Sequence, residues 1–497
     1  MSNLEKLKTD FNPRRTFKCS HSTIEVDGVF VRVAEDNDRQ NSWRKIHYSS
    51  SSDPNTSTKL LIDIEDVLQD PAIIRSARVS TGRDTKEVDE KAQGLVNYLW
   101  RDRHATPLEG GIHFRLRHET PVAFAEPFFN LFASHNEFSG RYSVLDGDYY
   151  TPQNLQAEVQ KEFEDAEREA NEVYSQLLGM SVAKEMARFA HIYRFITKFY
   201  MTISLRHLLE FFTYDLSYHP LALNTEFMEV IPALKDLVKC WTPWAYQAFE
   251  ENPRPVSSRM IQLSKDIIAT ARQNIFFSDI YKEYKVLDRG SLRVVDYWGN
   301  VDVAMASLDA FPNPYKGFDN IGMTFAVNMP IPVYRQWVRH RHGVMTKLIV
   351  DYDSIVKDRM FYIPTKYRMQ RGKVGHYVFE DMNEADNKKV QDILERHIDA
   401  ASVRYRRLRD LGVCPDIAAL NLPYTFYVPV TWSVPFTGLV NFFSLRTDSH
   451  AQSEMQQYSM SAWNGMLEYF KDTGFNDGIT GVIRSLYYGD NPTVKAL

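Results

Sequence analysis

The sequence has few cysteines and no long apolar run. Its three cysteines, Cys19, Cys240 and Cys414, lie far apart and in no metal-like spacing. This excludes a disulfide scaffold and a cysteine-based zinc site, and we expect no bound metal. No apolar segment approaches membrane-spanning length, and residues 1–18 are polar, without the apolar core of a signal peptide. We therefore expect a soluble, cytoplasmic protein with no membrane partner.

A large excess of one charge is also missing. The formal net charge of −5, with 25% charged residues, argues against a surface that coats a nucleic acid polymer. Any anion that the protein binds should therefore be small and held in a local pocket. At 497 residues the chain is too long for one ordinary core, which predicts two or three domains.

Local patterns predict the main segments. Apolar spacing predicts helices at 88–100 and 155–178, the second of them charged and amphipathic with a solvated face. Alternation predicts a strand at 112–116, and the apolar, aromatic residues 195–212 predict a core helix. Residues 234–279 are expected to be helical, with a break at Asn-Pro-Arg-Pro 252–255 that suits a connector between domains. The first 60 residues are expected to be irregular.

The chain contains an internal repeat with the period of a whole domain. In each half, four residues are spaced four, five and four apart within a similar apolar frame. They are Arg206, Glu210, Asp215 and His219 in the first half, and Thr437, Asn441, Arg446 and His450 in the second. Upstream, Tyr-Tyr-Thr-Pro at 149–152 echoes Phe-Tyr-Ile-Pro at 361–364. We interpret the chain as two copies of one unit, about 60–250 and 285–497.

The two copies carry complementary motifs. The second copy contains Arg335-Gln336-Trp337-Val338-Arg339-His340-Arg341, where the first has only Phe129-Asn130-Leu131. Arginine stays charged, and its planar fork matches phosphate or carboxylate oxygens two at a time. The first copy contains Asn136-Glu137-Phe138-Ser139-Gly140-Arg141. This segment combines a carboxylate, a hydroxyl, a glycine and an arginine, which suits a phosphate cradle or, alternatively, an ordinary turn.

Together these residues resemble the flavin-dependent thymidylate synthases, whose signature is Arg-His-Arg followed, after seven intervening residues, by Ser and then Gly-Arg. Four further segments are similar to that family: Ala77-Arg78-Val79-Ser80, His104-Ala105-Thr106-Pro107-Leu108-Glu109, Leu287-Asp288-Arg289-Gly290 and residues 441–452. The resemblance implies an α+β protein with two tandem copies of the family's fold forming an intrachain pseudo-dimer. The implied parts are an irregular extension (1–60), a first copy (61–250), a helical connector (251–284) and a second copy (285–497).

In that family the active site is built across subunits, so the resemblance implies one composite site in this chain. The second copy would contribute Gln336, Arg339 and Arg446 to the nucleotide. The first copy would contribute the other substrate contacts, which are Glu137, Phe138, Ser139, Gly140, Arg141 and Arg188. At the places that match Arg188 and Arg446, the chain has Ala419 and Asp215, so the reciprocal site would lack these charges.

The same resemblance divides the flavin contacts between the copies. The second copy would supply Arg339, His340, Arg341, Asn441 and Leu445. The first copy would supply Ser80, Thr106, Glu109, Asn136, Glu137, Ser204 and Arg206. Ser204 stands where the family has an asparagine, and the equivalent pair in the second copy, Pro435 and Thr437, would bind flavin poorly.

The implied reaction is C5 methylation of dUMP to dTMP. Reduced FAD would supply hydride, 5,10-methylenetetrahydrofolate the carbon, and NADPH would reload the flavin, while the protein orients and polarises. Arg446 would be the catalytic residue, because its charge favours an electron-rich uracil ring. Arg141 and Arg188 would clamp the phosphate. Ser139 is interpreted as a hydrogen-bond donor, because no general base lies at a suitable spacing.

Several alternatives stay open. Arg446 could form a salt bridge on the helix surface with Asp448 or Glu454, and His340 could be a structural histidine. The substrate could be another pyrimidine nucleotide, UMP or dCMP, or the chain could be a non-catalytic nucleotide- or flavin-binding assembly protein. Because the family assembles as a tetramer, two chains are expected to form a homodimer that resembles it. The expected partners are small molecules, a nucleotide and a folate.

Overall fold

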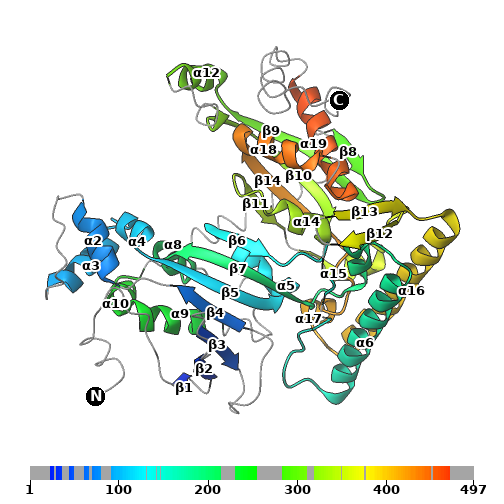
Figure 1. The fold of residues 1–497 in the computed structure, drawn as a ribbon, viewed down its shortest axis with the longest axis horizontal. Coiled ribbons are helices and arrows are strands. Elements are labelled where there is room, and N and C mark those ends of the chain that lie inside the picture. The colour runs from blue at the N-terminus through cyan, green and yellow to red at the C-terminus, as the bar shows by residue number, and fades with distance from the viewer. Residues whose placement is uncertain are drawn as a thin grey trace. The chain divides into compact units, whose positions relative to one another are not determined.

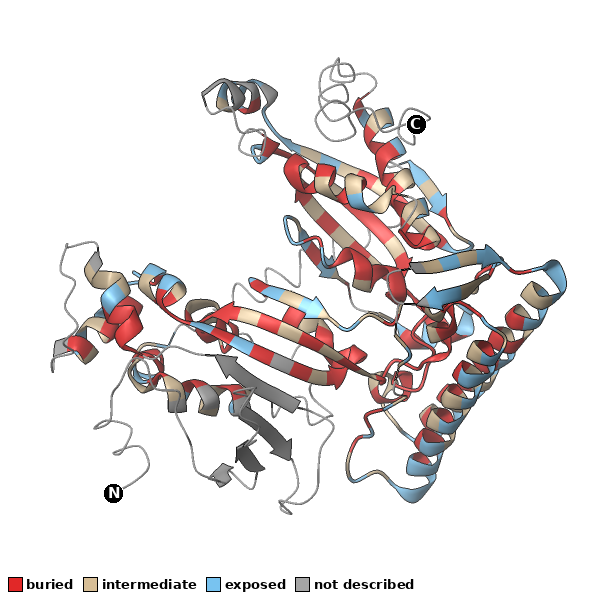
Figure 2. Cartoon of the chain, viewed as in Figure 1, coloured by how far each residue is buried: buried red, intermediate tan, exposed pale blue. Residues whose placement is uncertain are grey.

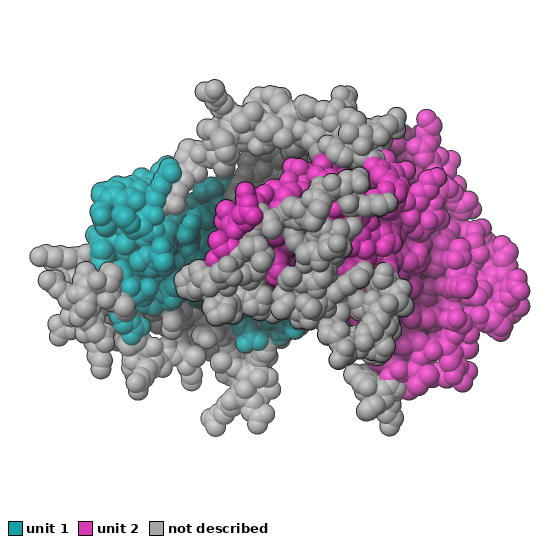
Figure 3. Space-filling view, turned by 90° about the horizontal axis from the view of Figure 1, so that it is seen from above, with its two compact units in different colours: residues 1–139, 146–160, 193–258 teal, residues 140–145, 161–192, 259–497 magenta. Residues whose placement is uncertain are grey.

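The structure of the protein is a computed structural model. It describes residues 23–26, 29–35, 44–49, 61–66, 70–79, 91–129, 131–141, 143–145, 147–213, 230–253, 282–310, 318–348, 350–373, 376–448 and 451–470. The chain divides into two compact units, shown in teal and magenta in Figure 3. Unit 1 comprises Met1–Ser139, Asp146–Gln160 and Tyr193–Ser258, and unit 2 comprises Gly140–Leu145, Lys161–Ile192 and Arg259–Leu497. No helix among the described residues is long and apolar enough to cross a membrane.

Unit 1 is organised around an antiparallel sheet with strand order β1-β2-β3-β4-β5-β7-β6 (Figure 1). Its strands are β1 (Thr23–Val26), β2 (Val29–Glu35), β3 (Arg44–Ser49), β4 (Leu61–Asp66), β5 (His113–Pro121), β6 (Ala133–Glu137) and β7 (Ile196–Ser204). Its helices are α2 (Pro71–Val79), α3 (Lys91–Arg101), α4 (Thr106–Gly111), α5 (Val122–Phe129), α8 (Leu205–Phe211), α9 (Val230–Trp241) and α10 (Pro243–Glu251). The helix predicted at 88–100 and the strand predicted at 112–116 are confirmed by α3 and β5.

Two predictions about unit 1 are wrong. Residues 195–212 were expected to form one core helix, but they form the central strand β7 followed by the short helix α8. Isoleucine, threonine and aromatic residues dominate β7, and such residues suit a pleated surface that is paired on both sides. The first 60 residues were expected to be irregular, yet β1, β2 and β3 extend the sheet, and the alternating valines of β2 favour a strand.

Unit 2 contains a second antiparallel sheet, with strand order β11-β14-β10-β9-β8, and a separate hairpin β12-β13. The strands are β8 (Glu283–Val286), β9 (Gly290–Gly299), β10 (Ile321–Pro330), β11 (Val344–Lys347), β12 (Arg368–Lys373), β13 (His376–Asp381) and β14 (Tyr427–Pro435). The helices are α6 (Ala157–Gly179, in unit 2 from Lys161), α7 (Lys184–Ala187), the 3-10 turn η1 (Arg188–Ala190), α12 (Val301–Ala310), α14 (Ile331–Trp337), α15 (Tyr352–Lys357), α16 (Glu384–Asp410), α17 (Pro415–Ala419), α18 (Phe436–Arg446) and α19 (Ser453–Phe470).

The order of elements follows the internal repeat. The strand order β4-β5-β7-β6 of one sheet matches β9-β10-β14-β11 of the other. In both halves of the chain, a short helix directly follows each of two corresponding strands (α5 and α8, α14 and α18). A long helix and a short helix also precede the second of these strands (α6 and α7, α16 and α17). The similarity of motifs in the sequence is therefore accompanied by a similarity of topology.

The compact units do not follow the expected copy boundaries. Segment Lys161–Ile192 belongs to the first copy by sequence, but it lies in unit 2. There Tyr174 and Leu177 of α6 share a buried core with Ile393 and Leu394 of α16. Figure 2 shows both long helices with one buried and one exposed side, so the amphipathic helix predicted at 155–178 is confirmed as α6.

Polar contacts add to the α6–α16 packing. Glu169 of α6 accepts a hydrogen bond from Arg404 Nη2 at 2.7 Å and lies 3.0 Å from His397 Nδ1. Burial of a leucine such as Leu177 contributes roughly 1.5–3 kcal/mol to the free energy of unfolding, so these apolar contacts stabilise the packing of α6 on α16. The pair carries the η1 turn, and with it Arg188, into the second unit.

Candidate active site

The arginine stretch, Arg335 to Arg341, begins in the last turn of α14, whose first turn contains a proline that presets the backbone for a helix start. Trp337 anchors the end of this helix, because its buried ring stacks on Phe442 of α18 with centroids 4.7 Å apart. Beyond Trp337 the chain leaves the helix, and His340 is buried whereas Arg339 and Arg341 on either side are exposed. Beyond α14 the stretch therefore has one buried imidazole between two exposed guanidinium groups.

Arg446, the last residue of α18, is held by the arginine stretch. Its Nε donates to Nε2 of His340 at 2.8 Å, and its Nη2 donates to the carbonyl of Gln336 at 3.3 Å. Burial, followed by the charges of Arg446 and His342, lowers the pKa of His340 to about 3. The imidazole is therefore neutral at physiological pH, and its Nε2 can accept. His340 therefore orients Arg446 without neutralising its charge, which is a structural role. Its predicted contact with the flavin stays a prediction.

The alternative of a surface salt bridge for Arg446 is not found. Within the described part of the chain, Arg446 bonds only the imidazole and the carbonyl named above. Glu454, one of the two proposed partners, is buried and accepts from the Tyr362 hydroxyl at 3.0 Å. Asp448 uses its backbone carbonyl to accept from Gln456. Among the described residues, no carboxylate therefore forms an ion pair with Arg446.

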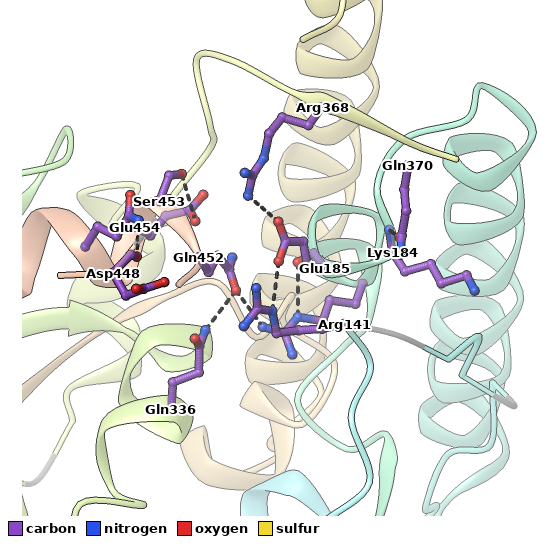
Figure 4. Close-up of polar contacts among 12 residues, drawn as sticks. Arg141, Lys184, Glu185, Gln336, Arg368, Gln370, Asp448, Gln452, Ser453 and Glu454 are labelled. Carbon is purple, nitrogen blue, oxygen red and sulfur yellow. Dashed lines mark hydrogen bonds and ion pairs between the residues drawn. The ribbon is translucent and has the colours of Figure 1, made fainter. Parts of the chain in front are cut away.

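A buried amide joins the two sequence copies within unit 2 (Figure 4). Gln452, which lies just before α19, is completely inaccessible to solvent. Its Oε1 accepts from Nη2 of Arg188 at 3.1 Å and from Nε2 of Gln336 at 2.8 Å. Arg188 belongs to the first copy and Gln336 to the second, so one carbonyl oxygen connects residues that the sequence assigned to opposite halves of the site.

A buried carboxylate holds Arg141 (Figure 4). Glu185 of α7 is 0% exposed, and its Oε2 lies 2.9 Å from Nε of Arg141. Its other oxygen pairs with Arg368 of β12. Gly140 is buried, and a Cβ there would lie 3.2 and 3.3 Å from the two methyl carbons of Leu145. Glycine therefore lets the backbone of this turn pack closely against the Leu145 side chain.

Four arginines form what we call the arginine cluster of unit 2: Arg141, Arg188, Arg339 and Arg446. Burial, and then the charges of Arg339 and Arg141, lower the pKa of Arg446 to about 10. Partial desolvation by the surrounding protein, and then the charge of Arg188, lower the pKa of Arg339. Part of the Arg339 side chain is nevertheless exposed. Folding thus holds like charges close together, which favours binding of an anion that offsets their repulsion.

The remaining flavin candidates of the second copy lie on α18. Asn441 is half-buried, and its backbone carbonyl accepts from the Ser444 hydroxyl at 3.0 Å. Leu445 is 54% exposed, an unusual place for a leucine on a helix whose other apolar residues are largely buried. Both residues are accessible to a ligand, and their predicted roles in flavin binding stay predictions.

The first-copy candidates are divided between the units. Gly140, Arg141 and Arg188 lie in unit 2, while the others that the structure describes lie in unit 1: Thr106, Glu109, Asn136, Glu137, Phe138, Ser139, Ser204 and Arg206. In unit 1, Arg206 pairs with Glu109 at 2.8 Å and with Glu210 at 3.1 Å, and these carboxylates raise its pKa. Ser80, Asp215 and His450 lie outside the described residues.

Two residues of unit 1 already have structural partners. Oε1 of Glu137 accepts from the Thr197 hydroxyl at 2.6 Å. The Ser204 hydroxyl accepts from the backbone N–H of His207 at 3.3 Å and so caps α8. The structure therefore gives Ser204 a capping role that the sequence analysis did not predict.

Sequence reasoning missed Gln452, Glu185 and Arg368 as parts of this arrangement. Gln452 ends the C-terminal segment that resembles the family, and Glu185 lies three residues before Arg188, so both were close to recognised signals. Nothing in the sequence linked Arg368 to Glu185, because the contact spans 183 residues. Only the folded chain shows that a carboxylate lies between Arg141 and Arg368.

The sequence profile of the family described as thymidylate synthase complementing protein matches residues 64–244 and 314–470, which together exceed half of the 497 residues. The flavin-dependent thymidylate synthase of Thermosipho africanus is 34% identical over 202 residues, covering 37% of this chain and 88% of the relative. The chain belongs to this family of flavin-dependent thymidylate synthases. The family consists of enzymes, and the chain is an enzyme of that type.

Other members of the family are similar to only part of this chain. A flavin-dependent thymidylate synthase of Thermus thermophilus is 33% identical over 206 residues, covering 38% of this chain and 74% of the relative. A solved structure of the UMP/dUMP methylase PolB from Streptomyces cacaoi, bound with 5-Br dUMP, is 22% identical, with a TM-score of 0.34. The match covers 39% of this chain and 96% of the PolB chain. The two segments matched by the family profile agree with the internal repeat.

Proposed function

We propose that the chain methylates dUMP at C5, with methylenetetrahydrofolate as carbon donor and NADPH as reductant, at one composite site per chain. The proposal rests chiefly on the arginine cluster of unit 2. Arg141 and Arg188 come from the first sequence copy, Arg339 and Arg446 from the second, and each arginine is one that the family resemblance assigns to the nucleotide. A nucleotide monophosphate supplies negative charge that offsets the repulsion among these arginines.

The residues present also fit the flavin implied by the family. The exposed Arg339 and Arg341 and the half-buried Asn441 offer cationic and amide groups for the FAD phosphates and ring. When bound, the flavin supplies the hydride for the reaction. The protein's own contribution is to hold the nucleotide and to stabilise charge on its ring.

Arg446 has the chemistry for that electrostatic role. With a pKa of about 10 it stays charged at neutral pH, and its hydrogen-bond partners among the described residues are a neutral imidazole and a carbonyl. A preorganised, partly desolvated cation of this kind stabilises negative charge that develops on a uracil ring, without reorganisation during the reaction. Arg141 and Arg188 are suited to the phosphate, since guanidinium groups bind two of its oxygens at once.

We also propose that the two copies form an intrachain pseudo-dimer and that two chains associate as a homodimer. The matching strand orders and the location of the first-copy segment Lys161–Ile192 in unit 2 support an association of the two copies. Light scattering coupled to gel filtration would measure the mass in solution. A monomer at working concentrations would refute the homodimer.

The function is tested by incubating the purified, FAD-loaded protein with NADPH, methylenetetrahydrofolate and either dUMP, UMP or dCMP, and by measuring product masses. We expect dTMP from dUMP, no turnover by Arg446→Ala and nearly unchanged turnover by Asp215→Ala, the matching position of the reciprocal site. Methylation of UMP or dCMP instead of dUMP would show that the substrate is that nucleotide and would refute dUMP as the substrate. A protein that takes up no FAD and methylates none of the three would be a binding or assembly protein.

A further inference from the structure

Gln452 has an unusual hydrogen-bonding arrangement. It is fully buried, and its single carbonyl oxygen accepts from both Arg188 and Gln336, at 3.1 and 2.8 Å. Its Nε2 has no hydrogen-bond partner among the described residues, and neither has Oε1 of Gln336. Two buried polar atoms are thus left unpaired while one carbonyl receives two donors.

The orientation of both amides follows from their donors. Arg188 has no acceptor atom, so the atom of Gln452 that faces it must be the oxygen. Nε2 of Gln336 also donates to the carbonyl of Pro332 at 3.2 Å, which assigns its nitrogen independently. Flipping either amide would place two donors or two acceptors against each other, so the unpaired atoms are a consequence of holding Arg188 and Gln336 in these positions.

Arg188 and Arg141 differ in the charge of the groups that hold them. Arg141 lies against the buried carboxylate of Glu185, which offsets its charge. Arg188 is held by a neutral amide and by the backbone carbonyl of Glu185 at 3.1 Å, and no ion pair of Arg188 occurs in the described part of the chain. A neutral acceptor fixes the direction of a guanidinium and leaves its full charge for a ligand.

We propose that Gln452 is a positioning residue that fixes Arg188, from the first copy, beside Gln336, from the second, so that the composite site can bind the phosphate of its nucleotide. This inference rests on the proposed function for the identity of the ligand. Gln452 does not need to contact the nucleotide. It acts through Arg188, whose direction it sets and whose charge it does not neutralise.

The test measures binding of dUMP and of deoxyuridine to the FAD-loaded protein by calorimetry, for the wild type, Gln452→Met, Arg188→Ala and the double variant. Gln452→Met keeps the volume but removes the acceptor, so we expect dUMP binding to weaken about tenfold and deoxyuridine binding to change less than about threefold. In the Arg188→Ala background, Gln452→Met should cause little further loss for dUMP, because the two residues act as one unit.

Two further variants separate positioning from packing. Gln452→Glu keeps an acceptor oxygen but adds a negative charge, so dUMP should again bind more weakly while the melting temperature changes little. In turnover, both Gln452 variants should raise KM for dUMP more than they lower kcat. Gln391→Met, which removes a half-buried amide on α16 that donates to Glu395, is the matched control and should behave as the wild type.

The outcomes distinguish this inference from the proposed function. Equal losses for dUMP and deoxyuridine, or an undiminished effect of Gln452→Met in the Arg188→Ala background, would overturn the positioning role even if dUMP is methylated. If Gln452→Met does not fold, unchanged dUMP binding by Gln452→Glu would overturn it. A protein that shows the expected coupling but methylates no dUMP would refute the proposed function alone.

Discussion

The replacement Arg446→Lys tests the electrostatics of the arginine cluster directly. Burial and the charges of Arg339 and Arg141 take the pKa of Arg446 from 12.5 to about 10, a difference of about 2.5 units. At 1.36 kcal/mol per unit, the folded protein therefore disfavours this cation by roughly 3 kcal/mol. Arginine tolerates such a shift at neutral pH because its unperturbed pKa is so high. Lysine, with an unperturbed pKa of about 10.4, would have a pKa of about 8 in the same environment.

The expected result is a change in pH dependence. Because the charged form is lost as pH rises through the lowered pKa, the lysine variant should lose dUMP affinity and turnover between about pH 7 and 9. The ratio of variant to wild type, measured at each pH from about 6.5 to 9.5, removes the titration of the nucleotide phosphate, which is common to both proteins. Arg371→Lys is the matched control, because Arg371 is exposed on β12 and pairs with Glu380. A ratio for Arg446→Lys that stays constant up to about pH 9.5 would refute the placement of this cation in a repulsive, partly buried cluster.

Three further changes probe the surroundings of the site and the fold. Glu185→Gln removes the carboxylate that lies between two arginines at a fully buried position, so thermal unfolding should show a loss of about 3 kcal/mol and calorimetry a weaker affinity for dUMP. Gly343→Ala would place a Cβ 2.5 Å from Nε1 of Trp432, so the loop should shift, with about 1–3 kcal/mol lost and weaker flavin binding. Gly179→Ala, with open space around the added carbon, should do neither. Burial raises the pKa of Asp70 to about 7, so folding takes up a proton and the free energy of unfolding should fall as pH rises from about 4 to 7, by up to about 4 kcal/mol. Asp70→Asn should abolish that fall in denaturant titrations, and a persisting slope would contradict the assignment.

Strong local patterns predicted the elements that depend on local sequence. The spacing of charged and apolar residues in α6 predicts an amphipathic helix, and the alternation at 112–116 predicts a strand that β5 contains. Residues 195–212 show where this reasoning failed. A segment rich in apolar and aromatic residues suits either a buried helix or a doubly paired strand, and pairing of β7 with both β5 and β6 decides the matter. That pairing is a property of distant segments.

The candidate site was predictable only where it depends on local sequence patterns. Arginines that bind anions are recognisable by residue type and spacing, and the repeat showed which copy had lost which charge. Glu185 and Gln452, which hold Arg141 and Arg188, were missed, and His340 was recognised without its contact to Arg446. Glu185, Gln452 and His340 contact their arginines through one or two hydrogen bonds each, and neither an amide nor an imidazole reveals its partner by its position in the chain.

The sequence by itself determined the family and indicated the internal repeat and the candidate arginines, because these depend on residue types at fixed spacings. Tertiary structure decided that Lys161–Ile192 packs in unit 2, and it thereby brought Arg188 to Gln452 and Gln336. It also decided how each cation is held: Arg141 against a carboxylate, Arg188 by a neutral amide and Arg446 by an uncharged imidazole. The physical reason is that burial and the direction of a hydrogen bond arise only where segments far apart in the chain meet.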